Sequence, residues 1–119
     1  MLASKIINSL NCQKILMIND DFMQRAYQYA FASDLMSDAL VLIGDNGSQT
    51  VFLTGLCNVQ TLLTAQMLDI DFIIYVRDKI PDETVVAKAK ELEINLFTTQ
   101  SNMFIAAGKL YQQGLKSPS

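Results

Sequence analysis

Three strand-like runs in the second half of the chain, each followed by a segment with helical periodicity, constrain the fold most strongly. The runs cover residues 50–54, 72–77 and 95–99. They are short and almost wholly apolar, as strands buried on both faces of a parallel sheet are. Strands joined in series through helices run parallel, with right-handed crossovers. The pattern therefore predicts an α/β fold, a three-layer domain with a mostly parallel sheet and helices on both faces.

Capping residues mark where these three helices begin and end. Asn58 is a good N-cap for the first helix, and Pro81 and Asp82 suit the first turn of the second. Ser101 is a candidate cap for the third, and Gly114 a candidate stop. The apolar stripes of the three helices are Val59, Leu62, Leu63 and Met67, then Val85, Val86, Ala89 and Leu92, then Met103, Phe104, Ala107, Leu110 and Tyr111.

The first half of the chain has a weaker pattern. Residues 26–32 alternate aromatic and other side chains, which favours a strand and leaves a helix open. Ser33 or Asp34 would then cap a short helix through Leu42. The other predicted elements are a helix over 2–10, a strand over 14–18 and a turn over 44–48. Because no linker is found and 50% of the 119 residues are hydrophobic, we expect one domain over residues 1–115 with a flexible tail over 116–119.

Composition excludes several kinds of chemistry. The chain contains no His, which removes Ser-His-Asp triads, Cys-His dyads and His-ligated zinc. It has neither a GxxxxGK[ST] loop nor a GxGxxG loop. Its two cysteines, Cys12 and Cys57, lie too far apart in sequence for a metal-binding CxxC pair. We therefore predict no catalytic residues, no metal and no cofactor.

Charge and cysteine content indicate the setting. The net charge is -3 and Lys and Arg are scattered, so no basic face for nucleic acid is expected. No apolar run approaches the ~20 residues that a membrane span needs. Two distant cysteines suit a reducing compartment, so we expect a cytoplasmic protein.

Polar loops follow the predicted strands at their carboxyl ends, where ligands bind in open α/β sheets. Gly55 and Asn58 form one such turn, which either holds an anion at a helix N-terminus or is a plain capped turn. Thr98 and Thr99 either line a pocket with Asn58 or simply cap a helix. Arg77, after the middle strand, is either a ligand contact or an exposed salt link.

Two further positions carry side chains that can do chemistry. Asp34 and Asp38, four residues apart, would share one face of a helix, and paired carboxylates can do acid–base work. The alternative is that Ser33 and Asp34 cap and solvate a helix start. Cys57 would lie near a helix N-terminus, where a thiolate is stabilised, although a structural cysteine is the simpler interpretation.

Taken in order, these segments resemble the DRTGG domain, a module related to the N-terminal domain of HPr kinase/phosphorylase. Residues 33–38 (Ser-Asp-Leu-Met-Ser-Asp) are similar to a "SDLLSD" segment of single-domain members. Gly55 with Asn58-Val59 resembles the family's central turn, and Pro81-Asp82 is also similar. The last unit matches at Thr98 or Thr99, Phe104, Ala107, Gly108, Leu110 and Tyr111.

The resemblance spans roughly residues 26–114 and departs from the family at its name-giving residues. Leu56-Cys57 lie near the position of the family's Asp-Arg pair, and Val76-Arg77-Asp78 lie near the position of its Thr-Gly-Gly segment. The resemblance implies a three-layer α/β fold and a non-catalytic regulatory role, in a family whose members are often fused to CBS or catalytic domains.

The leading hypothesis is a non-catalytic regulatory module that binds a small anionic or nucleotide-like ligand, or a partner protein. The candidate ligand-binding residues are Ser33, Asp34, Gly55, Asn58, Arg77, Thr98 and Thr99. The second hypothesis is a structural homodimer, with an apolar patch supplied by Tyr27, Tyr29, Phe31 and Leu35. The third is a small enzyme that uses Asp34 with Asp38, or Cys57.

Overall fold

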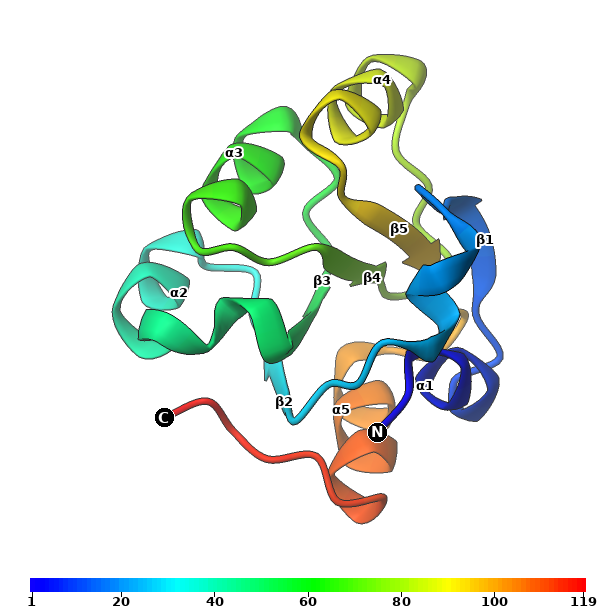
Figure 1. Ribbon diagram of the computed structural model, residues 1–119, viewed down its shortest axis with the longest axis vertical. Helices are drawn as coiled ribbons and strands as arrows, with labels where there is room; N and C mark the ends of the chain where they lie inside the picture. The colour runs from blue at the N-terminus through cyan, green and yellow to red at the C-terminus, as the bar shows by residue number, and fades with distance from the viewer.

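The computed structural model describes residues 1–119 as one five-stranded sheet covered by helices on both faces (Figure 1). The strand order is β1-β5-β4-β3-β2, and β2 to β5 run parallel while β1 is antiparallel to β5. The strands are β1 (Gln13–Leu16), β2 (Tyr29–Ala32), β3 (Thr50–Thr54), β4 (Phe72–Tyr75) and β5 (Asn95–Thr98). The predicted fold class is therefore confirmed.

Five α-helices and two 3-10 helices cover this sheet. The α-helices are α1 (Ala3–Ser9), α2 (Met36–Leu42), α3 (Val59–Met67), α4 (Glu83–Leu92) and α5 (Met103–Gln112). The 3-10 helices are η1 (Asp20–Gln24) and η2 (Gly44–Gln49), the second of which replaces the simple turn predicted there. None of these helices has the length and apolar character needed to cross a membrane.

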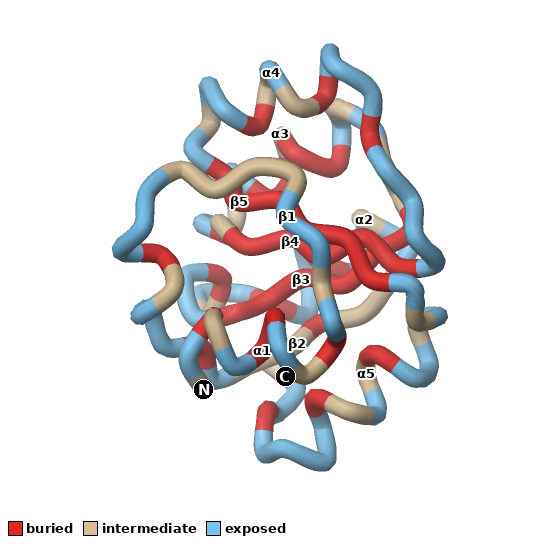
Figure 2. The backbone as a smooth tube through the Cα atoms, turned by 90° about the vertical axis from the view of Figure 1, so that its right-hand side faces the viewer, coloured by how far each residue is buried: buried red, intermediate tan, exposed pale blue.

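The strands alternate their side chains between two cores, one on each face of the sheet. Val51 and Leu53 of β3 face a core built with α1, η1 and α5. Phe52, between them, faces a core built with α2, α3 and α4. The strands β3, β4 and β5 are buried throughout and run through the centre of the molecule (Figure 2). This burial on both faces explains their nearly continuous apolar sequences.

Side-chain caps mark the start of three of the five α-helices. Asn58 caps α3 as predicted, because its side chain accepts from the Thr61 N–H at 2.8 Å. Asp82 caps α4 in the same way through the Val85 N–H. The cap of α5 is Asn102 rather than the predicted Ser101. Gly114, at φ +105°, follows the end of α5 as expected.

The predicted cap of the second helix is wrong. Helix α2 begins at Met36, with Leu35 in the N-cap position and no side-chain cap. The Ser33 hydroxyl instead accepts from the Leu35 N–H. The Asp34 carboxylate accepts a hydrogen bond from the Gly55 N–H, just after the next strand. Asp34 and Asp38 therefore do not share a helix face, because Asp34 lies outside the helix.

Candidate functional site

The carboxyl ends of β2 and β3 are joined by one carboxylate. Asp34 follows β2, and its Oδ1 accepts from the backbone N–H of Gly55 at 2.6 Å and from Thr54 Oγ1 at 3.1 Å. The second oxygen, Oδ2, makes no hydrogen bond, and Asp34 is exposed. One half of the carboxylate is thus structural, and the other half is open to solvent.

Gly55 leaves the space into which two charged side chains reach. A Cβ on Gly55 would lie 3.2 Å from Arg77 Nη2 and 3.4 Å from Asp34 Oδ1. Arg77 and Asp34 therefore approach the same glycine, yet they form no ion pair. Arg77 is exposed. Asp34, Gly55 and Arg77 form a cluster, called here the edge cluster, on three consecutive strand ends.

The backbone that presents Arg77 has an uncommon conformation. Arg77 and Asp78 both have φ of 58°, in the left-handed region that glycine adopts without strain. Their N–H groups donate to Ser101 O at 2.9 Å and Thr99 O at 2.7 Å, which fixes the turn against the loop after β5. These positions were placed by sequence near the Thr-Gly-Gly of the DRTGG domain, and the conformation explains why glycine suits them.

The remaining predicted ligand residues use their side chains within the fold. Asn58 Oδ1 accepts from both the N–H and the hydroxyl of Thr61. Thr98 Oγ1 donates to Lys79 O at 2.8 Å, and Thr99 Oγ1 donates to Leu10 O at 2.7 Å. Both threonines are buried. The structure therefore brings together only three of the seven candidates as the edge cluster, with Ser33 beside Asp34 in sequence.

Cys57 lies beside the edge cluster in an environment that favours the protonated thiol. Burial raises its pKa, and the ammonium group of Lys79 only partly opposes this. The neighbouring Tyr75 hydroxyl is buried without a hydrogen-bond partner, and burial raises its pKa, with Cys57 adding to the shift. A thiol held in its neutral form is a weak nucleophile. No group of three or more Cys, Asp or Glu side chains is arranged to hold a metal ion.

Two of the four residues predicted to form an apolar patch for self-association are buried, while Tyr29 is half-buried and Leu35 is exposed. Tyr27 is fully buried in the core under α1 and α5, and Phe31 is buried in the core on the opposite face. The Tyr27 hydroxyl donates to Asp71 Oδ1 at 2.8 Å, and Arg25 pairs with the other oxygen of that carboxylate. Sequence alternation did indicate a strand here, but it could not show that Tyr27 and Phe31 pack into the two cores.

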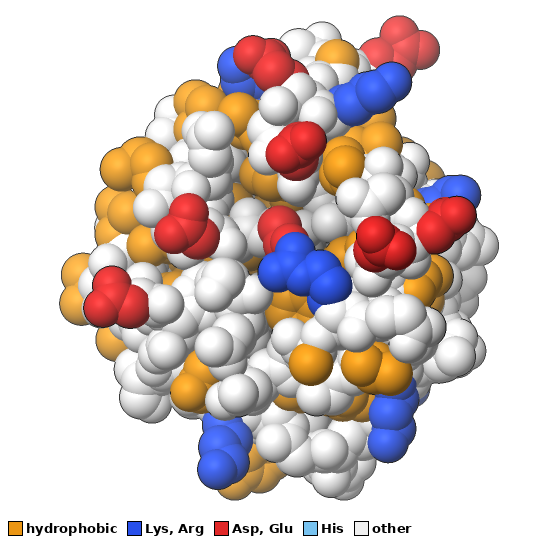
Figure 3. Space-filling view, in the orientation of Figure 1, with side chains coloured by type: hydrophobic (Ala, Val, Ile, Leu, Met, Phe, Trp, Pro, Cys, Tyr) orange, Lys and Arg blue, Asp and Glu red, His pale blue; other side chains and the backbone are white.

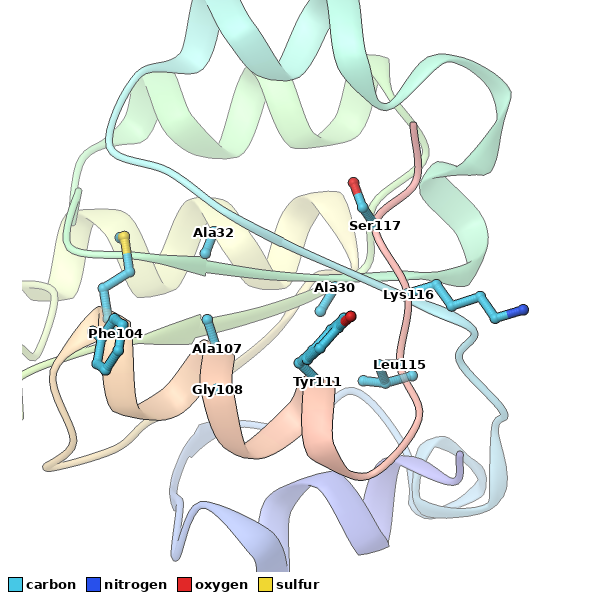
Figure 4. Close-up of a pocket in the computed structure, with 10 residues that line it drawn as sticks. Ala30, Ala32, Phe104, Ala107, Gly108, Tyr111, Leu115, Lys116 and Ser117 are labelled. Carbon is cyan, nitrogen blue, oxygen red and sulfur yellow. The ribbon is translucent and has the colours of Figure 1, made fainter.

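Sequence analysis missed an apolar groove between α5, β2 and the C-terminal tail, called here the α5 groove (Figure 4). Its volume is about 460 Å³. Phe104 and Tyr111 stand at its rim with 83% and 78% of their surfaces exposed. They were grouped with the apolar stripe of α5, but the buried face of that helix is formed by Ala106 and Leu110. The sequence feature that could have indicated this groove is a pair of aromatic residues seven positions apart with small residues between them.

Charged side chains do not gather on the face shown in Figure 3, where both signs are interspersed. This distribution matches the net charge of -3 and the scattered basic residues of the sequence.

Comparison with known proteins shows what this fold is similar to. No protein-family model matches the sequence, and no curated protein matches it. A solved structure does: the CBS and DRTGG domains of the regulatory region of Clostridium perfringens pyrophosphatase, complexed with its activator diadenosine tetraphosphate. The TM-score is 0.71 over 96% of this chain, at 14% sequence identity.

The chain has a DRTGG-like fold. It spans about half of the pyrophosphatase regulatory structure, 47% of that chain. The DRTGG-like fold confirms the resemblance drawn from the order and spacing of short segments.

Proposed function

We propose that this chain is a non-catalytic regulatory module that binds a small anionic ligand at the edge cluster. The observation that carries the proposal is Arg77, an exposed guanidinium without an ion-pair partner, held over Gly55 by a strained turn. Backbone strain of this kind is concentrated at functional sites. The position is also the carboxyl edge of a parallel sheet, where such folds bind ligands.

The two side chains of the edge cluster suit different parts of one ligand. A guanidinium binds phosphate or carboxylate, often with two hydrogen bonds. The open Oδ2 of Asp34 accepts from a hydroxyl or amino group. A nucleotide carries both kinds of group, a phosphate and ribose hydroxyls. The ligand class that fits is therefore a phosphorylated compound with free hydroxyls.

The pyrophosphatase regulatory structure supports a nucleotide ligand to a limited extent. It holds diadenosine tetraphosphate, but it contains CBS domains as well as the DRTGG domain. That activator therefore supports a regulatory nucleotide for the combined region, and the edge cluster is the argument for this fold alone. The additional roles of Ser33, Asn58, Thr98 and Thr99, the single domain over 1–115 and the cytoplasmic setting stay predictions of the sequence.

Replacement of Arg77 by glycine tests the proposal. The wild-type protein is screened by thermal shift against nucleotides and phosphorylated metabolites, and each hit is titrated by calorimetry. We expect a saturable rise in melting temperature, because a ligand at 100 times its Kd adds ~2.7 kcal/mol. Arg77→Gly removes the guanidinium and suits the φ of 58°. We expect it to weaken binding at least tenfold and to raise the free energy of unfolding by ~0.5–1 kcal/mol.

Lys90→Ala is the matched control, since it removes an exposed cation from α4 without touching the edge cluster. Unchanged affinity in Arg77→Gly, or no response to any phosphorylated compound, would contradict the proposal.

A second candidate function is self-association as a homodimeric module. It is favoured by the α5 groove, because large exposed apolar surfaces on small domains mark interaction sites. The two candidates use different surfaces and are compatible in one protein.

A further inference from the structure

Gly108 is the least explained residue of helix α5. It lies in the middle of a ten-residue helix, where glycine costs ~1 kcal/mol relative to alanine. Its φ is not in the left-handed region, and a Cβ placed on it would meet nothing within 4 Å. Neither its own backbone nor packing within the chain therefore requires glycine here.

The groove-lining residues around Gly108 are arranged symmetrically along α5. Phe104 and Tyr111 lie seven residues apart, two helical turns, and Ala107 and Gly108 lie between them. All four line the α5 groove. Figure 4 shows these residues along one side of α5, facing β2 and the tail. At positions 104, 107, 108 and 111 the residues are therefore aromatic, small, small and aromatic.

We propose that a second copy of this chain binds in the α5 groove, with the two α5 helices antiparallel across a two-fold axis near Ala107 and Gly108. In that arrangement Phe104 of each copy contacts Tyr111 of the other. The small residues meet at the crossing point, where they let the helix backbones approach closely. Gly108 is then explained by the partner rather than by the monomer. This inference rests on the self-association proposed above and specifies its surface.

The C-terminal tail favours a helix over a strand as the occupant. Strand β2 is at the edge of the sheet, so a partner strand would normally be able to pair with it. Its outer side is already bridged by the tail, because Lys116 O accepts from the Ala30 N–H and the Lys116 N–H donates to Gln28 O. Pro118 has no N–H and cannot extend this ladder. Little free edge remains for strand addition.

The chemistry of the groove favours this chain as its own partner. Lys116 is the only charged residue among those that line the groove, so a charged peptide finds little to pair with. A fitting partner needs a helix with projecting aromatic side chains and small residues between them. A two-fold interface requires both features on the same surface, and α5 has both.

The exposed area is consistent with a weak, specific dimer. Two aromatic side chains that are mostly exposed supply roughly 250–400 Å² per copy. The smallest specific interfaces bury about 600 Å² per partner. The aromatic pair therefore supplies about half of what is needed.

Sedimentation equilibrium tests the proposal with the full chain, over a concentration series that reaches the millimolar range. We expect the wild type to dimerise and Phe104→Glu to raise the dimer Kd at least ~30-fold, the effect of losing a central aromatic anchor. Met67→Glu is the matched control, because Met67 is 74% exposed on α3, across the sheet from α5. It should leave the dimer Kd unchanged.

Gly108→Leu separates loss of the interface from loss of the fold. The Cβ of the new side chain meets nothing within 4 Å and leucine favours a helix, so the monomer should melt at a higher temperature. Its bulk at the crossing point should nevertheless prevent dimerisation. A wild type that stays monomeric overturns both this inference and the self-association candidate, while ligand binding at Arg77 is unaffected. A dimer that survives Phe104→Glu and Gly108→Leu, or one that Met67→Glu weakens equally, overturns the α5 surface alone.

Discussion

Two half-buried thiols and two buried phenols are held in their neutral forms by the fold. Burial raises the pKa of Cys12 from its ordinary value of 9.0 to about 12. Burial also raises the pKa of Tyr27, and the Asp71 carboxylate that accepts its hydrogen bond raises it further. Cys57 and Tyr75 shift in the same direction. In the unfolded chain all four groups ionise at lower pH than in the native protein.

Stability is therefore expected to fall in alkaline solution. Between the unfolded and folded pKa values the native state binds more protons, so the free energy of unfolding decreases as pH rises. We expect a plateau up to about pH 9 and then a fall of at most ~1.4 kcal/mol per pH unit for each group. Urea denaturation at several pH values under reducing conditions measures this pH dependence of the free energy of unfolding.

Cys12→Ala should make the alkaline fall less steep, whereas Tyr111→Phe, at an exposed position, should leave it unchanged. A wild-type stability that is flat through pH 11 would show that these groups are not desolvated as described.

At the scale of elements, two helical glycines, Gly47 and Gly108, play opposite parts. Gly47 lies in η2, where a Cβ would come within 1.6 Å of the Leu68 carbonyl oxygen at the end of α3. The glycine thus lets two backbone segments meet. Gly108 in α5 has open space at the same position.

Alanine at these two positions should act in opposite directions. Gly47→Ala forces η2 away from α3 and should lower the free energy of unfolding by ~1–3 kcal/mol. Gly108→Ala should raise it by ~0.5–1 kcal/mol, measured at concentrations low enough to keep the protein monomeric. Chemical denaturation of both variants beside the wild type gives the comparison. A neutral Gly47→Ala would be inconsistent with the contact between η2 and α3.

Sequence patterns predicted the elements whose causes are local. The strand β3 over Thr50–Thr54 was predicted at its observed bounds, because its apolar run is continuous and bounded by turns. The cap Asn58 was also predicted, since its side chain bonds three residues ahead. Asp82, expected in the first turn of α4, is instead its N-cap. The prediction for Asp34 was wrong because its partner, Gly55, follows the next strand and lies 21 residues away in the sequence. Contacts between elements carry no signal in a single sequence.

The face that a helix buries was harder to predict than the helix itself. The single apolar stripe predicted for α5 includes Leu110, Phe104 and Tyr111. In the structure Leu110 is buried together with Ala106, whereas Phe104 and Tyr111 remain exposed. In the edge cluster, the sequence located the strand ends but not the approach of Arg77 to Gly55, which depends on the left-handed turn.

At the scale of the whole molecule, two cores share one sheet. Leu53 belongs to the core under α1 and α5, and Leu62 to the core under α2, α3 and α4; both are fully buried. Because every central strand contributes to both cores, loss of packing on one face weakens the other. The protein should unfold as a single unit.

Leu53→Ala and Leu62→Ala test this coupling. Each should lower the free energy of unfolding by ~2–5 kcal/mol, the range for leucine to alanine in a packed core. Far-ultraviolet circular dichroism and tyrosine fluorescence should give coincident transitions in both variants. Separate transitions in either variant would indicate that one face can melt while the other persists.

The position of β1 beside β5 has a consequence for how the protein is made. Gln13 pairs with Thr98, so β1 cannot pair with its neighbour in the sheet until β5 has been synthesised. By contrast, β2 and β3 are consecutive strands and can pair early. During synthesis the segment that carries Ile6, Ile7 and Phe22 can meet β3 and β4 first, but its core is complete only once β5 and α5 have left the ribosome. All three residues are buried in the folded protein. A growing chain of this topology therefore carries an incompletely covered hydrophobic segment until its last unit is made, and such transient exposure favours aggregation.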